Sequence, residues 1–438
     1  MTPNPIAVGL LAVVFGLVIV RQLSGRGPPI WVTFGVGAIT TLGLGLVSPS
    51  GVVAVVESSA APVVLFLFAL FLFATALERS GALDHLAHWL IGRAATPDRL
   101  PFVLFVGFGL ASAVVVNDAL VLVGVPLLFS VARRLRVDPK PLLLVLAFAV
   151  TVGSALTPLG NPQNLLVSIS SGLSAPIVVF LEYLLAPTIA GLLLGGAYLR
   201  WIFRGSLASA NDDHARLRAS APALLPRGGW TSRLAAHPVL AIFPALLAGL
   251  LGLELYGSFT GAATPAIWLV SLAAAAILLS VSPNRRRLLG GVETTILLLF
   301  IGLFVVVQGA VDGGVIAGLE SFLPISGPGG PTTALWSIAG LSVGGSQLVS
   351  NVPWVALQIP VLTGLGYSGA TPLPWLALAA SSTLAGNVTL LGAASNLIVV
   401  ERAEHLGVRI RLSEFVRYGL PIAAVTVVLT VAFLTVGL

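Results

Sequence analysis

The sequence predicts an all-α polytopic membrane protein built from two inverted repeats, and three observations support this fold class. Of the 438 residues, 57% are apolar and only 9% are charged, whereas a soluble domain carries about a quarter charged residues. Apolar stretches long enough to cross a bilayer recur along the chain. The two halves of the chain also share motifs in the same order. These observations exclude an ordinary soluble domain and a disordered chain.

Membrane spans are expected wherever about 17–25 consecutive residues are mainly apolar. About ten segments meet this length, and two of them contain helix-breaking residues. They lie near residues 5–20, 30–48, 62–77, 141–171 (interrupted helix), 176–199, 238–253, 264–282, 292–311, 372–400 (interrupted helix) and 415–437.

Two further segments, 101–133 and 332–365, are expected to form re-entrant hairpins whose tips stop inside the membrane. Each segment has two apolar arms of about 16 residues, and a helix of that length covers about 24 Å, slightly less than a full crossing. A polar pair lies at each turn, Asn117-Asp118 in the first hairpin and Ser350-Asn351 in the second. Two short complete spans remain an alternative for each segment.

The chain is expected to comprise a first repeat at 1–202, a cytoplasmic linker at 203–236 and a second repeat at 237–438. At an offset of 234 residues, Asn117 matches Asn351. Each repeat crosses the membrane an odd number of times, so the second copy must be inverted. Inverted repeats with interrupted helices and a site at the bilayer midplane are the architecture of secondary transporters.

The basic residues give an orientation, because all 22 Lys and Arg fall on one side of this map. By the positive-inside rule that side is cytoplasmic, so both termini are expected outside a multi-pass protein of the inner (plasma) membrane. The net charge of +6 therefore reflects basic loops rather than nucleic-acid binding. The opposite loops carry the acidic residues Glu57, Glu254, Asp312 and Glu320.

Four polar clusters interrupt the apolar segments, two in each repeat. A helix broken at membrane depth frees carbonyl and N–H groups, which must line protein or a watery cavity because lipid cannot satisfy them. We therefore expect a substrate or ion site. Its candidate residues are Asn117, Asp118, Thr157, Gly160, Asn161, Asn164, Ser350, Asn351, Asn387, Thr389, Gly392, Ser395 and Asn396.

The residue types in these clusters suit two kinds of ligand. The half-helices that start near Asn164 and Asn396 present N-terminal N–H groups, which favour an anion or an oxygen-rich solute. Freed carbonyls and amide oxygens favour a hard cation such as Na⁺. The amides concerned are Asn117, Asn161, Asn351 and Asn387. The alternative is that these side chains only cap helix ends.

Asp118 is the candidate for proton or cation coupling. An ionisable group within the membrane is costly, so it indicates function by default. The matching residue of the second repeat is Val352, so the site is asymmetric in charge. The alternative is that Asp118 caps the second arm of its hairpin.

Several classes of chemistry lack support in the sequence. The chain has no cysteine, which excludes disulfides, cysteine-ligated metal and thiolate catalysis. It has no P-loop and no HExxH motif. We expect the protein to hold no resident metal and no cofactor beyond H⁺ or Na⁺ as coupling ion. We also expect that it is not an enzyme. A polytopic membrane enzyme and a passive channel are the alternatives from other classes.

At these clusters the sequence resembles the large ion-transporter superfamily of arsenite efflux permeases, Na⁺/H⁺ antiporters and citrate or dicarboxylate carriers. The resemblance covers nearly the whole chain. Its most specific stretches are NDALVLVGVPLL, TPLGNPQNLL, SNVP and AGNVTLLGAASNL. It implies a scaffold and a transport domain that moves like an elevator, with the hairpin tips and broken helices forming the substrate and cation sites.

The tips indicate a branch of this superfamily. Dicarboxylate carriers characteristically have Ser-Asn-Thr at both tips, whereas this chain has Val116-Asn117-Asp118 and Ser350-Asn351-Val352. The Asn-Asp tip is most similar to the arsenite permease-like branch. The resemblance therefore implies secondary active transport of a small oxygen-rich solute or oxyanion, coupled to H⁺ or Na⁺. Arsenite/antimonite-type efflux is the first candidate activity. A Na⁺/H⁺ antiporter or a citrate/dicarboxylate-type carrier is the alternative. A homodimer, and a soluble ATPase partner for arsenite efflux, are implied as possible.

Overall fold

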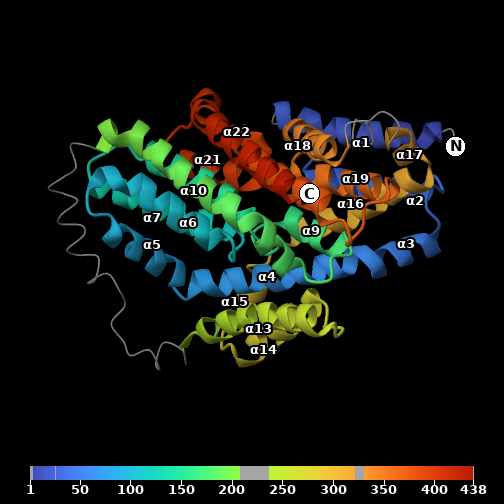
Figure 1. The fold of residues 1–438 in the computed structure, drawn as a ribbon, viewed down its shortest axis with the longest axis horizontal. Coiled ribbons are helices and arrows are strands. Elements are labelled where there is room, and N and C mark those ends of the chain that lie inside the picture. Colours follow the sequence, from blue (N-terminus) through green and yellow to red (C-terminus); the bar gives the residue numbers. More distant parts are fainter. Residues whose placement is uncertain (1–2, 25, 208–235, 321–329, 438) are drawn as a thin grey trace.

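The computed structural model describes residues 3–24, 26–207, 236–320 and 330–437, and these residues form helices and no strand (Figure 1). The linker predicted at 203–236 lies mostly outside the described residues, apart from the end of α10 and the start of the second half. The helices pack as two groups, and each group takes helices from both halves of the chain.

The first group consists of the early helices of each half. In the first half these are α1 (Pro5–Ser24), α2 (Ile30–Gly43), α3 (Pro49–Val55), a π-helical turn (Val56–Ala60) and α4 (Ala61–Arg79). In the second half they are α13 (Val239–Thr260), α14 (Ile267–Val281), α15 (Arg285–Leu289), α16 (Thr294–Asp312) and α17 (Val315–Glu320). The halves exchange partners here, because α2 packs on α16 and α14 packs on α4.

The second group holds the hairpins and broken helices. The first half contributes α6 (Leu100–Ser112), α7 (Asn117–Arg134), α8 (Lys140–Ser154), α9 (Pro162–Ser170) and α10 (Pro176–Leu207). The second half contributes α18 (Gly330–Val349), α19 (Asn351–Gly364), α20 (Pro372–Leu384), two 3₁₀ turns (Ala385–Asn387 and Leu390–Gly392), α21 (Ala394–His405) and α22 (Leu412–Val436). Helix α5 (Ala82–Arg93) and a 3₁₀ turn (Pro97–Arg99) connect the groups along the chain.

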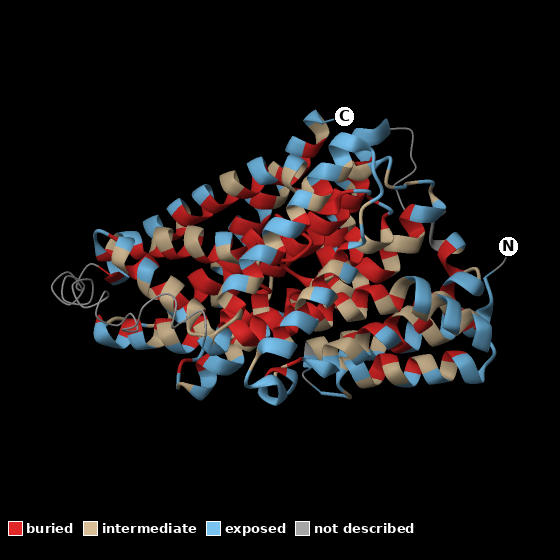
Figure 2. Cartoon of the chain, turned by 90° about the horizontal axis from the view of Figure 1, so that it is seen from below, coloured by how far each residue is buried: buried red, intermediate tan, exposed pale blue. Residues whose placement is uncertain are grey.

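The two halves also interlock in the second group. The second arm of each hairpin packs on the last part of the other half's broken helix, α7 on α21 and α19 on α9. The long helices α10 and α22 pack on each other. Helices α8 and α20 form the centre, since every residue of α8 after Lys140 and of α20 after Pro372 is buried. Figure 2 shows this buried interior surrounded by exposed outer helix faces.

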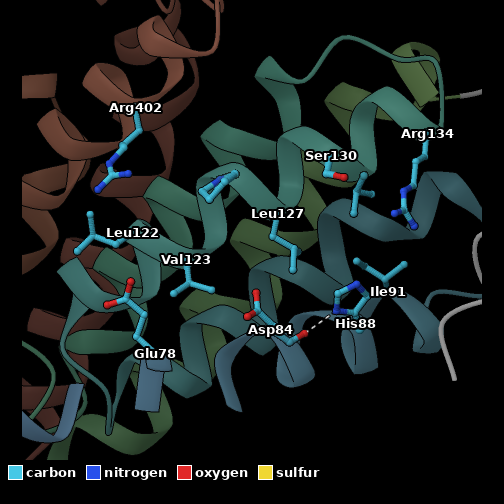
Figure 3. Close-up of a pocket in the computed structure, with 12 residues that line it drawn as sticks. Glu78, Asp84, His88, Ile91, Leu122, Val123, Leu127, Ser130, Arg134 and Arg402 are labelled. Atoms are coloured by element: carbon cyan, nitrogen blue, oxygen red, sulfur yellow. Dashed lines mark hydrogen bonds between the residues drawn. The ribbon is translucent and has the colours of Figure 1, made fainter. Parts of the chain in front are cut away.

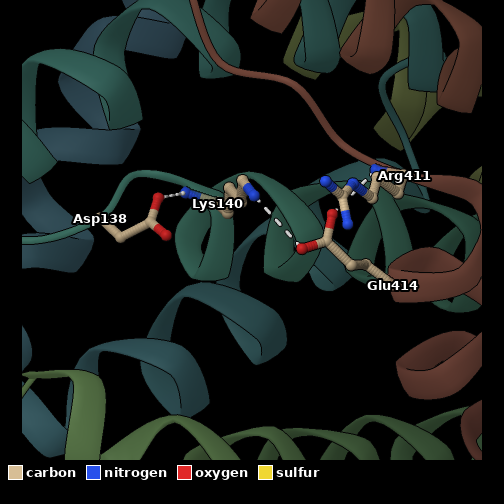
Figure 4. A network of polar contacts seen from close by, with 4 residues as sticks. All are labelled: Asp138, Lys140, Arg411 and Glu414. Carbon is tan, nitrogen blue, oxygen red and sulfur yellow. Dashed lines mark hydrogen bonds and ion pairs between the residues drawn. The ribbon is translucent and has the colours of Figure 1, made fainter.

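A polar network ties the two halves at one end of this centre (Figure 4). The ammonium of Lys140, at the start of α8, lies 3.2 Å from a carboxylate oxygen of Glu414 in the first turn of α22. The other carboxylate oxygen of Glu414 accepts the backbone N–H of Arg411 at 2.8 Å. Asp138 accepts the backbone N–H of Lys140 at 3.0 Å. These contacts fix the start of a broken helix beside the start of α22.

The described residues contain six helices that are long and apolar enough to span a membrane by length and composition, against the ten spans predicted. Three shorter apolar helices, Ile30–Gly43, Lys140–Ser154 and Ile267–Val281, fall below that length. The number of spans therefore stays a prediction. One of the six, Pro49–Arg79, begins well before the predicted 62–77, because α3 and the π turn continue directly into α4.

All four acidic residues that we expected in outer loops lie in helices instead, and two of them, Asp312 and Glu320, are the last residues of α16 and α17. Glu57 lies in the π turn, with an exposed side chain. Glu254 lies in α13 and is only 4% exposed. The buried residues of α13 are Val239, Phe243, Leu246, Leu250 and Glu254, which follow the three- and four-residue spacing of one helix face. The charge of Glu254 suggested a loop, but its position on this stripe places it inside.

Candidate transport site

Both broken helices are interrupted, and a polar side chain caps α9 after the first break and the 3₁₀ turn Leu390–Gly392 in the second. Helix α8 ends at Ser154 and α9 starts at Pro162, with irregular chain between them. The side-chain oxygen of Asn161 accepts the backbone N–H of Asn164 at 2.8 Å, which is an N-cap. In the second half, Thr389 accepts the N–H of Leu391 at 3.3 Å. Capping, the alternative interpretation, therefore applies to Asn161 and Thr389.

The amides of the first half are fully engaged with their own surroundings. The Asn117 amide contacts Ser112 Oγ at 2.5 Å and Ser154 Oγ at 3.1 Å. The Asn161 amide donates to the same Ser154 hydroxyl at 3.1 Å. The Asn164 amide donates to the carbonyl oxygens of Ser154 at 2.9 Å and of Thr157 at 3.2 Å. Ser154 is the hub of this first amide cluster.

Gly160 and Thr157 bring the hairpin tip against the break. The backbone N–H of Asn117 donates to the Gly160 carbonyl at 3.2 Å. A Cβ at Gly160 would stand 2.6 Å from the Ser154 carbonyl oxygen and 2.7 Å from that of Ser112, so only glycine fits there. Thr157 donates its hydroxyl to the carbonyl of Ala113, just before the tip.

A threonine from the second half completes the first cluster. Thr383, at the end of α20, donates to Asn164 Oδ1 at 2.9 Å and accepts from the Asn161 amide at 3.2 Å. At an offset of 232 residues Thr383 corresponds to Thr151. The Thr151 methyl would lie 3.2 Å from a Cβ at Gly386 in the second break. Each half therefore places a threonine against the broken helix of the other.

The second amide cluster surrounds Gly386. Asn396 donates to the Gly386 carbonyl at 2.6 Å, and Asn387 donates to the Phe148 carbonyl in α8 at 3.2 Å. The Asn351 amide nitrogen lies 3.7 Å from the point where a Gly386 Cβ would stand. Within the described residues, the side-chain oxygens of all three asparagines are buried without a hydrogen-bond partner, as is the Ser395 hydroxyl.

The two clusters differ at two positions next to the breaks. At an offset of 232 residues, Ser154 corresponds to Gly386 and Asn161 corresponds to Ala393. The second half therefore lacks the Ser154 hydroxyl, which binds the tip asparagine, and the Asn161 amide, which binds that hydroxyl and caps α9. Buried polar groups in native proteins are nearly always paired, and an unpaired one points to an ion or a solute. The second cluster is thus the better candidate for ligand binding.

The other second-half candidates line the same break. Thr389 donates to Gln347 Oε1 at 2.7 Å, and Gln347 Nε2 donates to the Ala385 carbonyl at 2.8 Å. A Cβ at Gly392 would stand 2.9 Å from that same carbonyl oxygen. Ser350, at the hairpin tip, has a φ of +71°, which is strained for a residue with a side chain.

Asp118 lies apart from both clusters, on the wall of a cavity of about 700 Å³. This cavity reaches Ala394, at the start of α21. It adjoins a second cavity of about 630 Å³, since Leu122, Pro126 and Arg402 line both. We call the two together the vestibule. Figure 3 shows the cavity of about 630 Å³, with Arg134 and Arg402 on its wall.

The vestibule is lined by more acidic than basic side chains. Five carboxylates line it, Glu78, Asp84, Asp118, Glu293 and Glu401, against two guanidinium groups, Arg134 and Arg402. His88 and His405 also line it. Such a cleft concentrates cations and repels anions.

Four residues of these clusters were missed by the sequence analysis: Ser112, Ser154, Gln347 and Thr383. The repeat itself could have found two of them. Ser112 matches Ser346 at the offset of 234 that pairs the tips, and Thr383 matches Thr151 at the offset of 232 that pairs the breaks. Gln347 carries no comparable signal, because its role depends on how the hairpin folds back onto the break.

Comparison with known proteins indicates that this protein is a transporter. A family model described as "Citrate transporter" matches residues 11–384. The chain belongs to the citrate transporter family. An uncharacterized transporter of Mycobacterium bovis is 29% identical over 390 residues, covering 85% of each chain. The silicon efflux transporter LSI3 of Oryza sativa is 25% identical, covering 78% of this chain and 79% of its own. The inner membrane protein YbiR of Escherichia coli is 29% identical over 343 residues.

Solved structures show the same fold class. The YdaH transporter of Alcanivorax borkumensis superposes with a TM-score of 0.57 at 19% identity, covering 93% of this chain and 97% of that one. MtrF of Neisseria gonorrhoeae superposes with a TM-score of 0.51 at 11% identity. This member of the citrate transporter family therefore has an all-helical membrane transporter fold. The family and the names of its relatives indicate a transporter rather than an enzyme.

Proposed function

We propose that the protein is a secondary active transporter that exports a small, uncharged, oxygen-rich solute, with arsenite or antimonite as the first candidate. The observation that carries the proposal is the vestibule. It runs from the arginines Arg134 and Arg402 to Asp118 and the start of α21. By the positive-inside rule that arginine-lined end is cytoplasmic, so a solute would enter from inside the cell.

The charges favour a neutral solute over citrate or a dicarboxylate. The vestibule repels anions, and no Lys or Arg is among the sequence-predicted site residues. Amide and hydroxyl groups, such as those of Asn351, Asn396 and Ser395, suit an uncharged hydroxylated molecule. The rice relative that is named a silicon efflux transporter also supports a solute other than citrate or a dicarboxylate. The family description favours the second candidate, a citrate-type carrier.

Coupling is assigned to Asp118 and the second amide cluster. Asp118 lies at the end of the vestibule opposite the cytoplasmic arginines, where its carboxylate can take up a proton or attract Na⁺ that enters from the cytoplasm. The unpaired oxygens of Asn351 and Asn387 offer ligands for Na⁺, which is held by oxygen atoms. The amides of Asn117 and Asn161, the other predicted Na⁺ ligands, are engaged within the protein.

Transport is proposed to follow an elevator cycle in the inner membrane, with the second helix group moving against the first. The hairpins, both broken helices, α10 and α22 would move together, because they interlock across the two halves. The hairpins would be re-entrant and both termini outside. The transporter would work as a homodimer, and a soluble ATPase would be its partner if the solute is arsenite.

The experiment that tests this proposal is flux into everted membrane vesicles that contain the protein. Arsenite, antimonite, citrate and ²²Na⁺ are offered separately, with an imposed H⁺ or Na⁺ gradient. We expect saturable arsenite or antimonite uptake that depends on one of the gradients, and little citrate uptake. Gradient-driven citrate uptake alone would favour the citrate-type carrier, and no flux of any of the four would refute both candidates.

The matched variants are Asp118→Asn and Asp312→Asn. Asp312 ends α16, is exposed, and accepts from the amide of Gln308 at 2.7 Å, away from the vestibule. We expect Asp118→Asn to abolish gradient-driven flux or to leave only downhill exchange, and Asp312→Asn to behave as the parent. Unchanged coupling in Asp118→Asn would remove Asp118 from the mechanism.

A further inference from the structure

Glu254 is a buried carboxylate that the transport site does not use. Its Oε2 accepts the backbone N–H of Val178 at 3.0 Å, and the N–H of Ile177 also binds the carboxylate. The other oxygen is buried without a hydrogen-bond partner in the described residues. Ile177 and Val178 belong to the first turn of α10, where backbone N–H groups have no partner inside the helix. Glu254 therefore supplies α10 with a cap from a different helix.

This contact bridges the two helix groups. Glu254 stands on α13, which packs on α14 and α4 in the first group. Its partner is the start of α10, which packs on α6, α8 and α22 in the second group. In an elevator cycle the second group moves relative to the first, so this contact must break. A carboxylate at a helix N-terminus is favourable, because it meets both free N–H groups and the positive end of the helix dipole.

The matching position of the first half makes no such contact. Helix α1 starts at Pro5 and α13 at Val239, an offset of 234 residues, so Val20 matches Glu254. Val20 is 54% exposed, whereas Glu254 is 4% exposed. In transporters built from inverted repeats, the two end states arise when the repeats exchange their relative arrangements. A contact made by only one repeat therefore belongs to one end state.

We infer that Glu254 is a latch that holds the transporter with its vestibule open to the cytoplasm, by binding the start of α10. The inference rests on the proposed function only in assuming alternating access, and not on the identity of the solute. Removing the latch shifts the population toward the outward-facing arrangement. It leaves the amide clusters and Asp118 untouched.

The test uses the absence of cysteine from the chain, so that a single introduced thiol is the only one that can react. Ser130→Cys reports on the vestibule, where Ser130 is exposed. Ser170→Cys reports on a separate cavity of about 270 Å³, lined by Ser58, Ser59 and Gln308. Each reporter is treated with a membrane-impermeant maleimide, Ser130→Cys in inside-out vesicles and Ser170→Cys in whole cells.

Glu254→Leu removes the latch, and Glu254→Gln keeps an acceptor oxygen but removes the charge. We expect Glu254→Leu to change the ratio of the two labelling rates by about tenfold, since hydrogen bonds to charged groups are worth at least that factor. Labelling at Ser130→Cys slows and labelling at Ser170→Cys accelerates. Glu254→Gln should change the ratio in the same direction by a smaller factor.

The matched control is Glu182→Gln, an exposed carboxylate about one turn further along α10, which should leave the ratio unchanged. An unchanged ratio in Glu254→Gln and Glu254→Leu, with parental melting temperatures, would overturn the latch, as would faster labelling at Ser130→Cys. If Glu254→Leu does not fold, Glu254→Gln decides alone. Because labelling needs no solute, a shifted ratio without arsenite flux keeps the latch and refutes only the proposed solute.

Discussion

Ser154 and Asn161 give the first break its hydrogen-bonding partners, and their replacement by Gly386 and Ala393 leaves the second break without them. The equivalent tip asparagines, Asn117 and Asn351, thus lie in two different environments. Asn117 is held by Ser112 and Ser154, while the oxygen of Asn351 is buried without a partner in the described chain. The first amide cluster is therefore internally paired, and the second keeps unpaired polar atoms that we propose bind the solute or Na⁺.

This difference predicts opposite outcomes for two equivalent substitutions. Asn117→Ala should lower the free energy of unfolding by about 1–3 kcal/mol, because it removes two buried hydrogen bonds, to Ser112 and Ser154. Asn351→Ala should cost less stability and instead weaken solute or Na⁺ dependence. Thermal unfolding in detergent, with flux measured in vesicles, separates the two. Equal losses of stability and equal losses of flux would contradict the asymmetry.

The sequence predicted which residues line the tips and breaks but not which of their polar groups are paired. It located the tips and breaks because glycine, proline and asparagine inside apolar segments are unusual. It could not distinguish bound from unbound amides, because that depends on Ser112, Ser154 and Thr383, which are ordinary small residues in a membrane helix. The sequence also placed Glu254 in a loop. Its burial could not be predicted, because it depends on which helix packs beside α13.

At the scale of helices, close packing of α6 on α8 depends on two glycines. A Cβ at Gly153 would stand 1.8 Å from the carbonyl oxygen of Gly109, so the two backbones touch. Contact between small residues is how membrane helices approach closely, because lipid supplies little drive for association. This contact holds the first hairpin against the first break.

Gly153→Ala should therefore destabilise the protein by about 1–3 kcal/mol or more, since a methyl group there forces the helices apart. Gly249→Ala is the matched control. Gly249 lies within α13, and a Cβ there has no atom within 4 Å. It should be neutral or slightly stabilising, because alanine is the better helix former. Melting temperatures of the two purified variants test this; equal melting temperatures would count against tight packing at Gly153.

The helix boundaries were predictable where hydrophobicity alone sets them. The starts of α1, α2 and α10 lie where the apolar stretches begin, and both hairpins turn at their polar pairs. The segment before residue 62 was not predictable in this way, since Glu57 and two serines interrupt it. The chain stays helical there through a π turn, which hydropathy does not report.

At the scale of the whole molecule, the one-sided distribution of Arg and Lys predicts the orientation. Alkaline phosphatase is active only outside the inner membrane and green fluorescent protein fluoresces mainly when folded inside. We expect a phosphatase fused after Leu438 to be active, and a fluorescent protein inserted in the linker at 208–235 to fluoresce. An inactive C-terminal phosphatase would reverse the orientation and, with it, the proposed direction of export.

The crossing of Thr151 and Thr383 has a consequence for how such a chain can arise. Each threonine lies at the broken helix of the opposite half, so a single copy expressed alone would leave its own break unfinished. An ancestor of half this length could have worked only as a pair of molecules inserted in opposite directions. Severing the present chain within its linker should accordingly yield two fragments that regain activity together and none apart.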